Sequence, residues 1–307
     1  MFEATRLTFY YAVSPVHMGA GSAIGAIDNP IQREVHTLHP MLAGSGLKGA
    51  LRHHFSRVWK KDELIKRIFG PDTNASDFAG ALSLSDAQLV ALPVRSLKGA
   101  YVYATCPLVL ARVKRLAQLA GVGANWTPPA VAADTALTAN GEIKSGDPLI
   151  LEAFEFKAEA GMATEIAEWL SENALPAGEE HQFFRNKIKT DLVILTDTDF
   201  AHFARHAMVV EPHVRIDDDS GTADDGGLFY TENLPPESIL LGLAQASVER
   251  FKKVNGSPRA DLLDADTILR RVFDGDGDKP GISDKLLQIG GDATTGRGLV
   301  LVHPIQM

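Results

Sequence analysis

"GAIDNPIQREVHT" at 25–37 and, shortly after it, "GSGLKGALR" at 44–52 place a carboxylate, Asp28, between a glycine-containing turn and several basic residues. In a loop, such a carboxylate is usually paired with neighbouring cations and solvated. Its functional alternative is to bind a divalent ion or to accept a proton during phosphoryl chemistry. This loop alone does not distinguish the two interpretations, so the other motifs of the sequence have to be considered.

The second stretch predicts a helix over 45–59, with Ser45 as the expected N-cap. Lys48 and Arg52 are four residues apart and share one face of this helix. A glycine turn that leads into a helix N-terminus exposes backbone N–H groups, which suit phosphate. The pattern is typical of a phosphate-binding surface, and an ordinary capped and solvated helix is the open alternative.

The charge of the chain is unevenly distributed. The 307 residues carry a net charge of −9, yet residues 1–120 hold 14 Lys and Arg against 8 Asp and Glu. Because binding to phosphate depends on local potential rather than on total charge, the basic first part is compatible with nucleic acid. With a single cysteine, Cys106, the sequence predicts no disulfide within the chain and a cytoplasmic location. No run of about 18 apolar residues occurs, so we expect no membrane span.

Strand and helix patterns alternate irregularly along the chain, which favours an α+β fold with a mostly antiparallel sheet. Residues 122–148 lack a clear period and are expected to form a flexible insertion. Residues 207–234 predict a long β-hairpin with an acidic tip. The remaining pattern predicts strands at 6–13, 80–96, 148–160 and 190–197, a final strand within 284–305, and helices at 62–69, 105–121 with Thr105 as cap, 164–175, 197–206 and 260–273.

Other motifs are weaker. "GAGSAIG" at 19–25 is one residue too long for the dinucleotide-binding fingerprint, and "DGDGDKPG" at 274–281 has Lys279 where an EF-hand loop needs glycine. "IGGDATTGRGLV" at 289–300 is a flexible glycine loop with Arg297, able to approach a phosphate or ribose closely. By itself, this loop indicates a turn before the last strand.

Several stretches together resemble one family. The glycine-rich run ending in "IDNPIQREVHT", the helix start "AGSGLKGALR", and the stretches "LFYTENLPPES" at 228–238 and "IGGDATTGRGLV" are similar to the backbone subunit of type III-B (Cmr) CRISPR effector complexes, in the RAMP superfamily. Segment 80–107 resembles the middle of that family, so the resemblance spans nearly the whole chain.

The resemblance implies a single domain over 1–307 with a modified ferredoxin-like (RRM-like) core, inserted subdomains, and a thumb, for which the 207–234 hairpin is the candidate. Copies of such a subunit stack head-to-tail along a guide CRISPR RNA, and complementary target RNA is cut at regular intervals. Further implied partners are a large cyclase-type subunit, a small helical subunit, and RAMP subunits that bind the guide 5′-handle and cap the filament. The implied activity is that of an endoribonuclease within the assembled complex.

The resemblance also assigns site residues. Asp28 falls where the family has the aspartate needed for target cleavage, and His17 and Glu232 fall near the scissile phosphate. A divalent ion, Mg²⁺ or Mn²⁺, is the implied cofactor, with Asp28 as its ligand. The implied RNA-binding residues are Arg33, Ser45, Lys48, Arg52, Gly290, Gly291, Thr294, Gly296 and Arg297.

The chemistry implied is attack by the target's own 2′-hydroxyl on the adjacent phosphorus, which depends largely on geometry. Four alternatives stay open at this point: a scaffold that spaces guide RNA without cutting, a backbone subunit of the type III-A (Csm) complexes, a RAMP protein that processes guide precursor, and, least favoured, a small-molecule enzyme unrelated to RNA.

Overall fold

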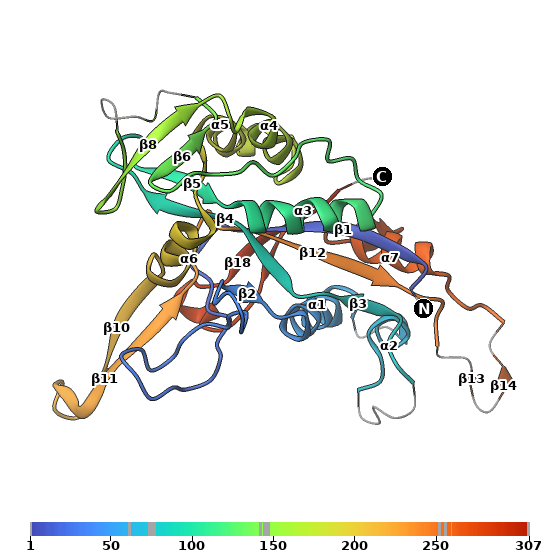
Figure 1. The fold of residues 1–307 in the computed structure, drawn as a ribbon. Helices are drawn as coiled ribbons and strands as arrows, with labels where there is room; N and C mark the ends of the chain where they lie inside the picture. Colours follow the sequence, from blue (N-terminus) through green and yellow to red (C-terminus); the bar gives the residue numbers. More distant parts are fainter. Residues whose placement is uncertain are drawn as a thin grey trace.

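One long sheet of the computed structural model joins strands from both ends of the chain (Figure 1). The structure describes residues 2–60, 63–72, 78–140, 143, 148–250, 253–254, 257–258 and 260–305. The sheet has the strand order β17-β18-β1-β12-β4-β5-β9-β6-β8-β7, with β2 beside β4 and β3 beside β12. These strands are β1 (Ala4–Ala12), β2 (Met41–Leu42), β3 (Leu82–Leu84), β4 (Ala87–Arg95), β5 (Tyr101–Thr105), β6 (Thr135–Thr138), β7 (Pro148–Leu151), β8 (Phe154–Ala160), β9 (Leu192–Ile194), β12 (Ile239–Ala246), β17 (Lys285–Gln288) and β18 (Leu299–Pro304).

Most neighbouring strands are antiparallel; within the described sheet, the parallel pairs are β5 with β9 and β6 with β8. The predicted α+β class with a mostly antiparallel sheet is therefore confirmed. Short separate pairs are formed by β13 (Lys253–Val254) with β14 (Ser257–Pro258) and by β15 (Gly275–Asp276) with β16 (Lys279–Pro280).

Strand β1 lies at the centre of the core, between β18 and β12. Its aromatic run is buried on both faces: Phe9, Tyr10 and Tyr11 are all at most 3% exposed. Phe9 packs against Trp169, and Tyr11 packs against Phe184. A strand covered on both faces loses the alternation of apolar and polar residues, which explains the continuous apolar pattern of this segment.

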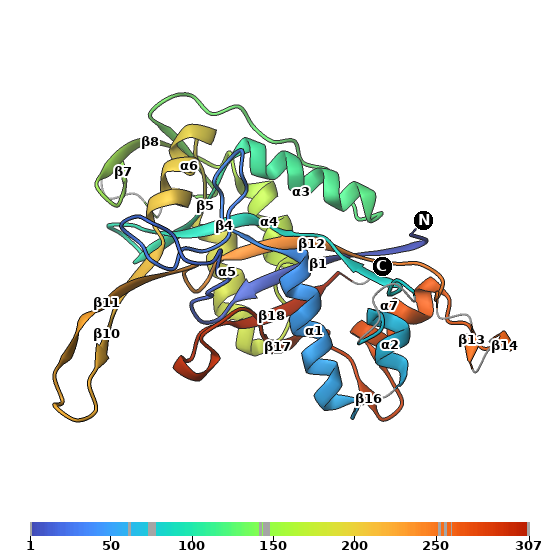
Figure 2. The same ribbon diagram turned by 90° about the horizontal axis from the view of Figure 1, so that it is seen from below.

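The helices surround this sheet (Figures 1 and 2). Trp169 and Phe184, which cover the Phe9 and Tyr11 side of β1, belong to two consecutive helices, α4 and α5. No helix within the described ranges is long and apolar enough to cross a membrane. The helices are α1 (Gly44–Val58), α2 (Glu63–Phe69), α3 (Pro107–Leu119), α4 (Thr164–Asn173), α5 (Gln182–Asp191), α6 (Asp197–His206) and α7 (Ala265–Phe273), with short 3-10 turns η1 (Glu179–His181) and η2 (Ala293–Thr295).

A two-stranded hairpin, β10 (Val209–Ile216) with β11 (Ala223–Asn233), projects from the body of the molecule (Figures 1 and 2). Apolar side chains remain exposed along it, among them Val214, Ile216 and Leu228 at about half of their full exposure (48%, 54% and 54%). The predicted hairpin at 207–234 is present, and its function as a thumb stays a prediction. An isolated two-stranded ribbon has few contacts of its own, so a binding partner would stabilise it.

Two predicted helix caps are wrong. The N-cap of α1 is Ala43, and the Gly44 N–H donates to Asp86 Oδ1 at 2.7 Å, while Ser45 lies exposed in the first turn. The N-cap of α3 is Cys106, because the Thr105 hydroxyl donates instead to the Val90 carbonyl at 2.7 Å. In both cases a distant segment supplies the hydrogen-bond partner.

The flexible insertion expected at 122–148 stays a prediction, and the described part of this segment contributes a strand to the main sheet. Strand β6 pairs with β8 and β9 inside the main sheet, and Trp126 is 4% exposed. Residues 141–142 and 144–147 of this segment lie outside the described residues. The irregular composition of this segment reflects a long connection between α3 and the short strand β6.

Candidate functional site at the base of the hairpin

The loop that contains Asp28 runs along the outer edge of β11. The Asn29 N–H donates to the Tyr230 carbonyl and the Glu232 N–H donates to the Asn29 carbonyl, both at 3.0 Å. Asp28 Oδ2 accepts a hydrogen bond from the Tyr230 N–H at 2.7 Å. Within the described part of the chain, Oδ1 of this half-buried carboxylate has no hydrogen-bond partner. Asp28 is thus fixed through Oδ2, and Oδ1 is left to interact with a bound molecule.

His17 is fixed at the same edge of β11. Its Nδ1 lies 2.7 Å from the Glu232 carbonyl oxygen. Because a carbonyl only accepts, Nδ1 carries the hydrogen, and the chemistry of the ring is left to Nε2. Gly19 lies beside Nε2, and a Cβ at position 19 would come within 2.8 Å of that nitrogen. A glycine there keeps this face of the imidazole open.

Asp28 and His17 therefore use the backbone of Tyr230 and Glu232, two residues of one strand, as their anchors. Alternate residues on a strand are about 7 Å apart. This spacing brings a carboxylate and an imidazole from a long loop to one edge, at the base of the projecting hairpin. Such a pair can accept a proton at one point and donate one nearby.

Glu232 lies beneath this edge and is 3% exposed. Its Oε2 accepts from the Ile31 N–H at 3.0 Å, and its Oε1 accepts from Arg33 Nη2 at 2.5 Å. Arg33 Nη1 also donates to the carbonyls of Leu38 and Ala204, at 2.7 and 2.8 Å. A contact of either charged group with RNA would require this network to open. The expected roles of Glu232 at the scissile phosphate and of Arg33 in RNA binding stay untested, and the geometry favours positioning of the Asp28 loop.

The predicted cations of α1 lie one and two turns into the helix. Lys48 Nζ donates to the Leu82 carbonyl at 2.9 Å. Burial lowers the pKa of Lys48, and the neighbouring charges of Arg52 and Arg250 lower it further. Arg52 donates to the Gly70 carbonyl at 3.0 Å and pairs with Asp72. An incoming phosphate would restore the stability of the charged Lys48, because an opposite charge favours the ionised form.

Helix α1 and the His17 segment are in contact through Met18. A Cβ at Gly46, in the first turn of α1, would come within 2.8 Å of Met18 Sδ. The exposed Ser45 is next to Gly46, so this end of the helix lies close to the His17 segment. The structure thus brings the first turn of α1 next to the segment that contains His17.

The glycine loop after β17 supports His17 from another side. The Gly291 N–H donates to the His17 carbonyl at 2.8 Å, and a Cβ at Gly290, whose φ is +90°, would lie only 2.5 Å from that oxygen. Thr294 and Gly296 are exposed at the tip. Arg297 turns back to Glu211 of β10, with Nη2 to Oε1 at 2.5 Å. The Gly291 and Gly296 N–H groups already donate within the protein, to the carbonyls of His17 and Ala293, and the Arg297 guanidinium already has a carboxylate partner.

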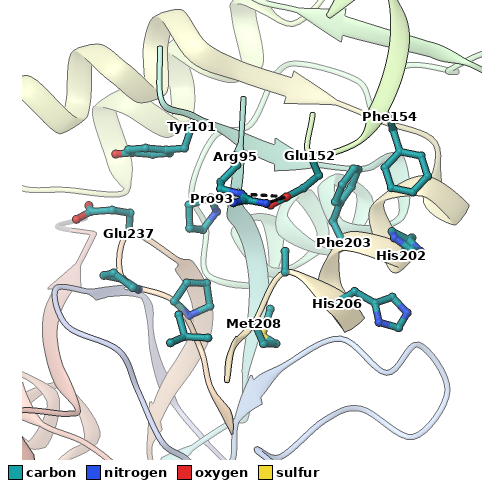
Figure 3. Close-up of a pocket in the computed structure, with 14 residues that line it drawn as sticks. Pro93, Arg95, Tyr101, Glu152, Phe154, His202, Phe203, His206, Met208 and Glu237 are labelled. Carbon is teal, nitrogen blue, oxygen red and sulfur yellow. Dashed lines mark hydrogen bonds and ion pairs between the residues drawn. The ribbon is translucent and has the colours of Figure 1, made fainter. Parts of the chain in front are cut away.

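A cavity of about 660 Å³ near the base of the hairpin was missed by sequence reasoning (Figure 3). Phe154, Phe203 and Met208 line it together with the ion pair of Arg95 and Glu152. Its lining comes from short stretches far apart in the sequence, so no local pattern predicts it. None of the predicted site residues lines this cavity.

Comparisons with known proteins identify relatives along nearly the whole chain. A sequence profile of the RAMP superfamily matches residues 9–301. The chain is 37% identical over 297 residues, 95% of its length and 92% of the other, to the CRISPR system Cmr endoribonuclease Cmr4 of Pyrococcus furiosus. It is 25% identical to the CRISPR system CMR subunit Cmr4 of Saccharolobus solfataricus, over 95% of this chain and 94% of that one.

Solved structures agree with these matches. Oligomeric Cmr4 from Pyrococcus furiosus superposes with a TM-score of 0.72 at 31% identity, covering 99% of this chain and 98% of that one. A chain of the type III-B Cmr-beta complex bound to cognate target RNA gives the same TM-score, 0.72, at 19% identity, covering 99% of this chain and 98% of that one, and shows the shared fold.

Proposed function

Because this chain belongs to the RAMP superfamily, in its Cmr4 branch, we propose that it is the backbone endoribonuclease subunit of a type III-B CRISPR effector complex. The observation that carries this proposal is the pair of Asp28 and His17. Their side chains are hydrogen-bonded to the backbones of Tyr230 and Glu232, which are two residues apart on the edge of β11. The hairpin that provides this edge projects from the body, where it can enter a nucleic acid bound outside (Figure 1).

We also propose a ferredoxin-like core for this subunit. The four strands β18, β1, β12 and β4 lie side by side in that order and are antiparallel. Along the chain, β1 is followed by α1 and β4, and β12 is followed by α7 and β18. This order supports the proposal, because a ferredoxin-like βαββαβ sheet has the same connections; the link between β4 and β12 would then carry an insertion.

The proposed reaction cuts target RNA by internal transfer. The 2′-oxygen of a target ribose attacks the adjacent phosphorus, the bond from phosphorus to the 5′-oxygen breaks, and a cyclic phosphate and a 5′-hydroxyl remain. Asp28 Oδ1 is the free acceptor for the 2′-hydroxyl proton. His17, when it carries a hydrogen on Nε2 as well as on the Nδ1 that is fixed on Glu232, is placed to orient the phosphate or to give that Nε2 proton to the leaving 5′-oxygen.

A divalent ion fits this site only as an RNA-associated ion. In the described part of the chain, no three His, Cys, Asp or Glu residues form a metal-binding group. Mg²⁺ is commonly held by one or two carboxylates together with substrate phosphates and water. Asp28 Oδ1 would then be the protein ligand instead of the direct acceptor of the 2′-hydroxyl proton, and the ion would add charge stabilisation at the phosphate.

The proposed RNA contacts use the surface beside this edge. The candidate contacts for the guide are Lys48 and the exposed Ser45 near the start of α1, and the glycine loop at Gly290, Gly291, Thr294 and Gly296. Phosphate contacts of this kind position an RNA without reading its bases. The proposed partners are guide CRISPR RNA, target RNA, further copies of this chain head-to-tail, and the other subunits of such a complex, in the cytoplasm.

Asp28→Asn in the reconstituted complex tests the proposal. The amide keeps an oxygen for the Tyr230 N–H but cannot accept the proton, so we expect normal assembly and a loss of target cutting of about 10²-fold or more. A target with a single 2′-deoxyribose at the cut site should resist the wild-type complex. The proposed chemistry would be contradicted if the Asp28→Asn complex cut its target at the normal rate, or if the wild-type complex cut the 2′-deoxyribose target at the normal rate. Wild-type assembly on guide and target without any cutting would leave a passive scaffold.

A further inference from the structure

We propose that Arg297 is a positioning residue for the cleavage site: its ion pair with Glu211 clamps the glycine loop to the hairpin and so keeps His17 in register with Asp28. This inference rests on the proposed function. It gives the Arg297 guanidinium a protein partner, where the family resemblance implies a contact with RNA.

The ion pair is a two-point contact. Arg297 Nη2 lies 2.5 Å from Glu211 Oε1, and Arg297 Nε lies 3.2 Å from Oε2. Asn233 Nδ2, on β11, donates to the same Oε2 at 3.2 Å. The side chains are 23% and 27% exposed, so the pair is partly shielded from water. Fork-like pairs between arginine and carboxylate combine strength with a defined geometry.

Glu211 acts on the stretch of β11 that holds the site. It lies directly opposite Thr231 in the hairpin register. Thr231 is the residue between Tyr230 and Glu232, whose backbones anchor Asp28 and His17. Opposite residues of an antiparallel pair are about 5 Å apart at Cα, so a displacement of Glu211 also displaces this stretch of β11.

The other end of the clamp is the His17 segment itself. Gly291 and Gly298, on either side of Arg297 in the glycine loop, donate their N–H groups to the carbonyls of His17 and Pro15, both at 2.8 Å. A closed ring of contacts results: His17 to β11, β11 to β10, Glu211 to Arg297, and the glycine loop back to His17. Without the ion pair, the His17 segment is held to this end of the hairpin by the Val16–Leu234 backbone hydrogen bonds and the Nδ1 contact of His17.

Two substitutions that each remove one charge separate this role from a role in RNA binding. In the assembled complex, Glu211→Gln and Arg297→Gln should each slow single-turnover target cleavage by about tenfold, since a misplacement of about 1 Å can cost up to about 10²-fold. Guide and target affinity should stay unchanged. The exchanged pair, Glu211→Arg with Arg297→Glu, should recover most of the wild-type rate.

The two interpretations predict opposite results for Glu211→Gln. If Arg297 binds phosphate, removal of the competing carboxylate should leave cleavage intact or tighten RNA binding. Arg297→Gln should then weaken RNA binding and reduce its salt dependence by about one phosphate contact. That combination would overturn the clamp, as would an exchanged pair no better than the single variants. If Arg297→Gln fails to assemble, the uncharged Glu211→Gln decides by itself.

Arg95→Gln is the matched control, because it breaks another ion pair with a glutamate, Glu152, on a side chain that is 81% exposed. It should cleave like wild type. The Asp28→Asn complex, measured in the same series, separates the two levels of the argument. If Asp28→Asn is inactive while Glu211→Gln is normal, only the clamp fails; if Asp28→Asn is active, the proposed function fails.

Discussion

At the scale of single residues, the site depends on its glycines as much as on its reactive side chains. His17 contacts β11 through Nδ1, while glycines leave room at its Nε2 and at its carbonyl. Gly290, at φ +90°, has a backbone conformation that L side chains rarely adopt, in addition to its closeness to the His17 oxygen. Two of the conspicuous glycines of the sequence therefore shape one histidine.

Gly19→Ala tests this arrangement. Its Cβ would come within 2.8 Å of His17 Nε2, so the imidazole must turn away from its place beside β11. We expect target cleavage by the complex to fall by about tenfold or more, because proton transfer by a positioned side chain contributes about 10²-fold or more.

The matched control is Gly25→Ala in the same loop, where a Cβ meets nothing within 4 Å. Thermal unfolding should be similar for both variants. Equal cleavage rates for the two alanine variants would show that the imidazole does not need this space.

At the scale of elements, the start of α1 shows how a helix end depends on another segment. Gly44 is buried, and its N–H is satisfied by Asp86, from the turn between β3 and β4. A Cβ at Gly44 would lie 2.4 Å from the Leu84 carbonyl, so the helix approaches that turn as closely as glycine allows. The end of α1 that we propose as an RNA contact is thereby fixed to the sheet.

Asp86→Ala should destabilise the protein by about 1 kcal/mol, the usual effect of losing a helix-capping carboxylate. Urea unfolding followed by circular dichroism measures this difference. Ser45→Ala, at the residue that the sequence suggested as the cap, should have no comparable effect on stability. A larger loss for Ser45→Ala than for Asp86→Ala would contradict the capping geometry.

At the scale of the whole molecule, the sheet joins distant parts of the chain, and this arrangement places a half-buried acid, Glu237, beside β1. The Tyr11 hydroxyl of β1 donates to Glu237, which lies between the hairpin and β12. Burial raises the pKa of Glu237 from its ordinary value of 4.5 to about 7. Between these two values the folded state binds more protons than the unfolded state, so stability falls as the pH rises.

Glu237→Gln should remove this part of the pH dependence. The free energy of unfolding of the wild type should fall between pH 4.5 and about 7 relative to the variant, and the difference should stay constant above that range. Glu155→Gln, an exposed position on β8, is the control that should follow the wild type. Parallel curves for wild type and Glu237→Gln would mean that this carboxyl ionises normally.

Local patterns predicted most of the regular elements. The aromatic run of β1, the periodic face of α1 and the paired strands at 207–234 are visible because their apolar spacing follows the geometry of a strand or a helix. Helix α5 was missed because its apolar face is narrow: Ile188 is its one fully buried residue, and Phe184 is partly buried against the core. The predicted strand at 148–160 is a tight hairpin of β7 and β8, whose turn has Glu152 at positive φ.

By itself, the sequence determined the α+β class, the hairpin and the identity of the residues that could do chemistry, since these follow from side-chain type and local spacing. Only the tertiary structure decided which of them meet. Asp28 and His17 share one strand edge because hydrogen bonds to Tyr230 and Glu232, some two hundred positions later in the chain, hold them there. It also decided that Arg33 and Arg297 face carboxylates, because burial requires a charged group to find its partner within the fold.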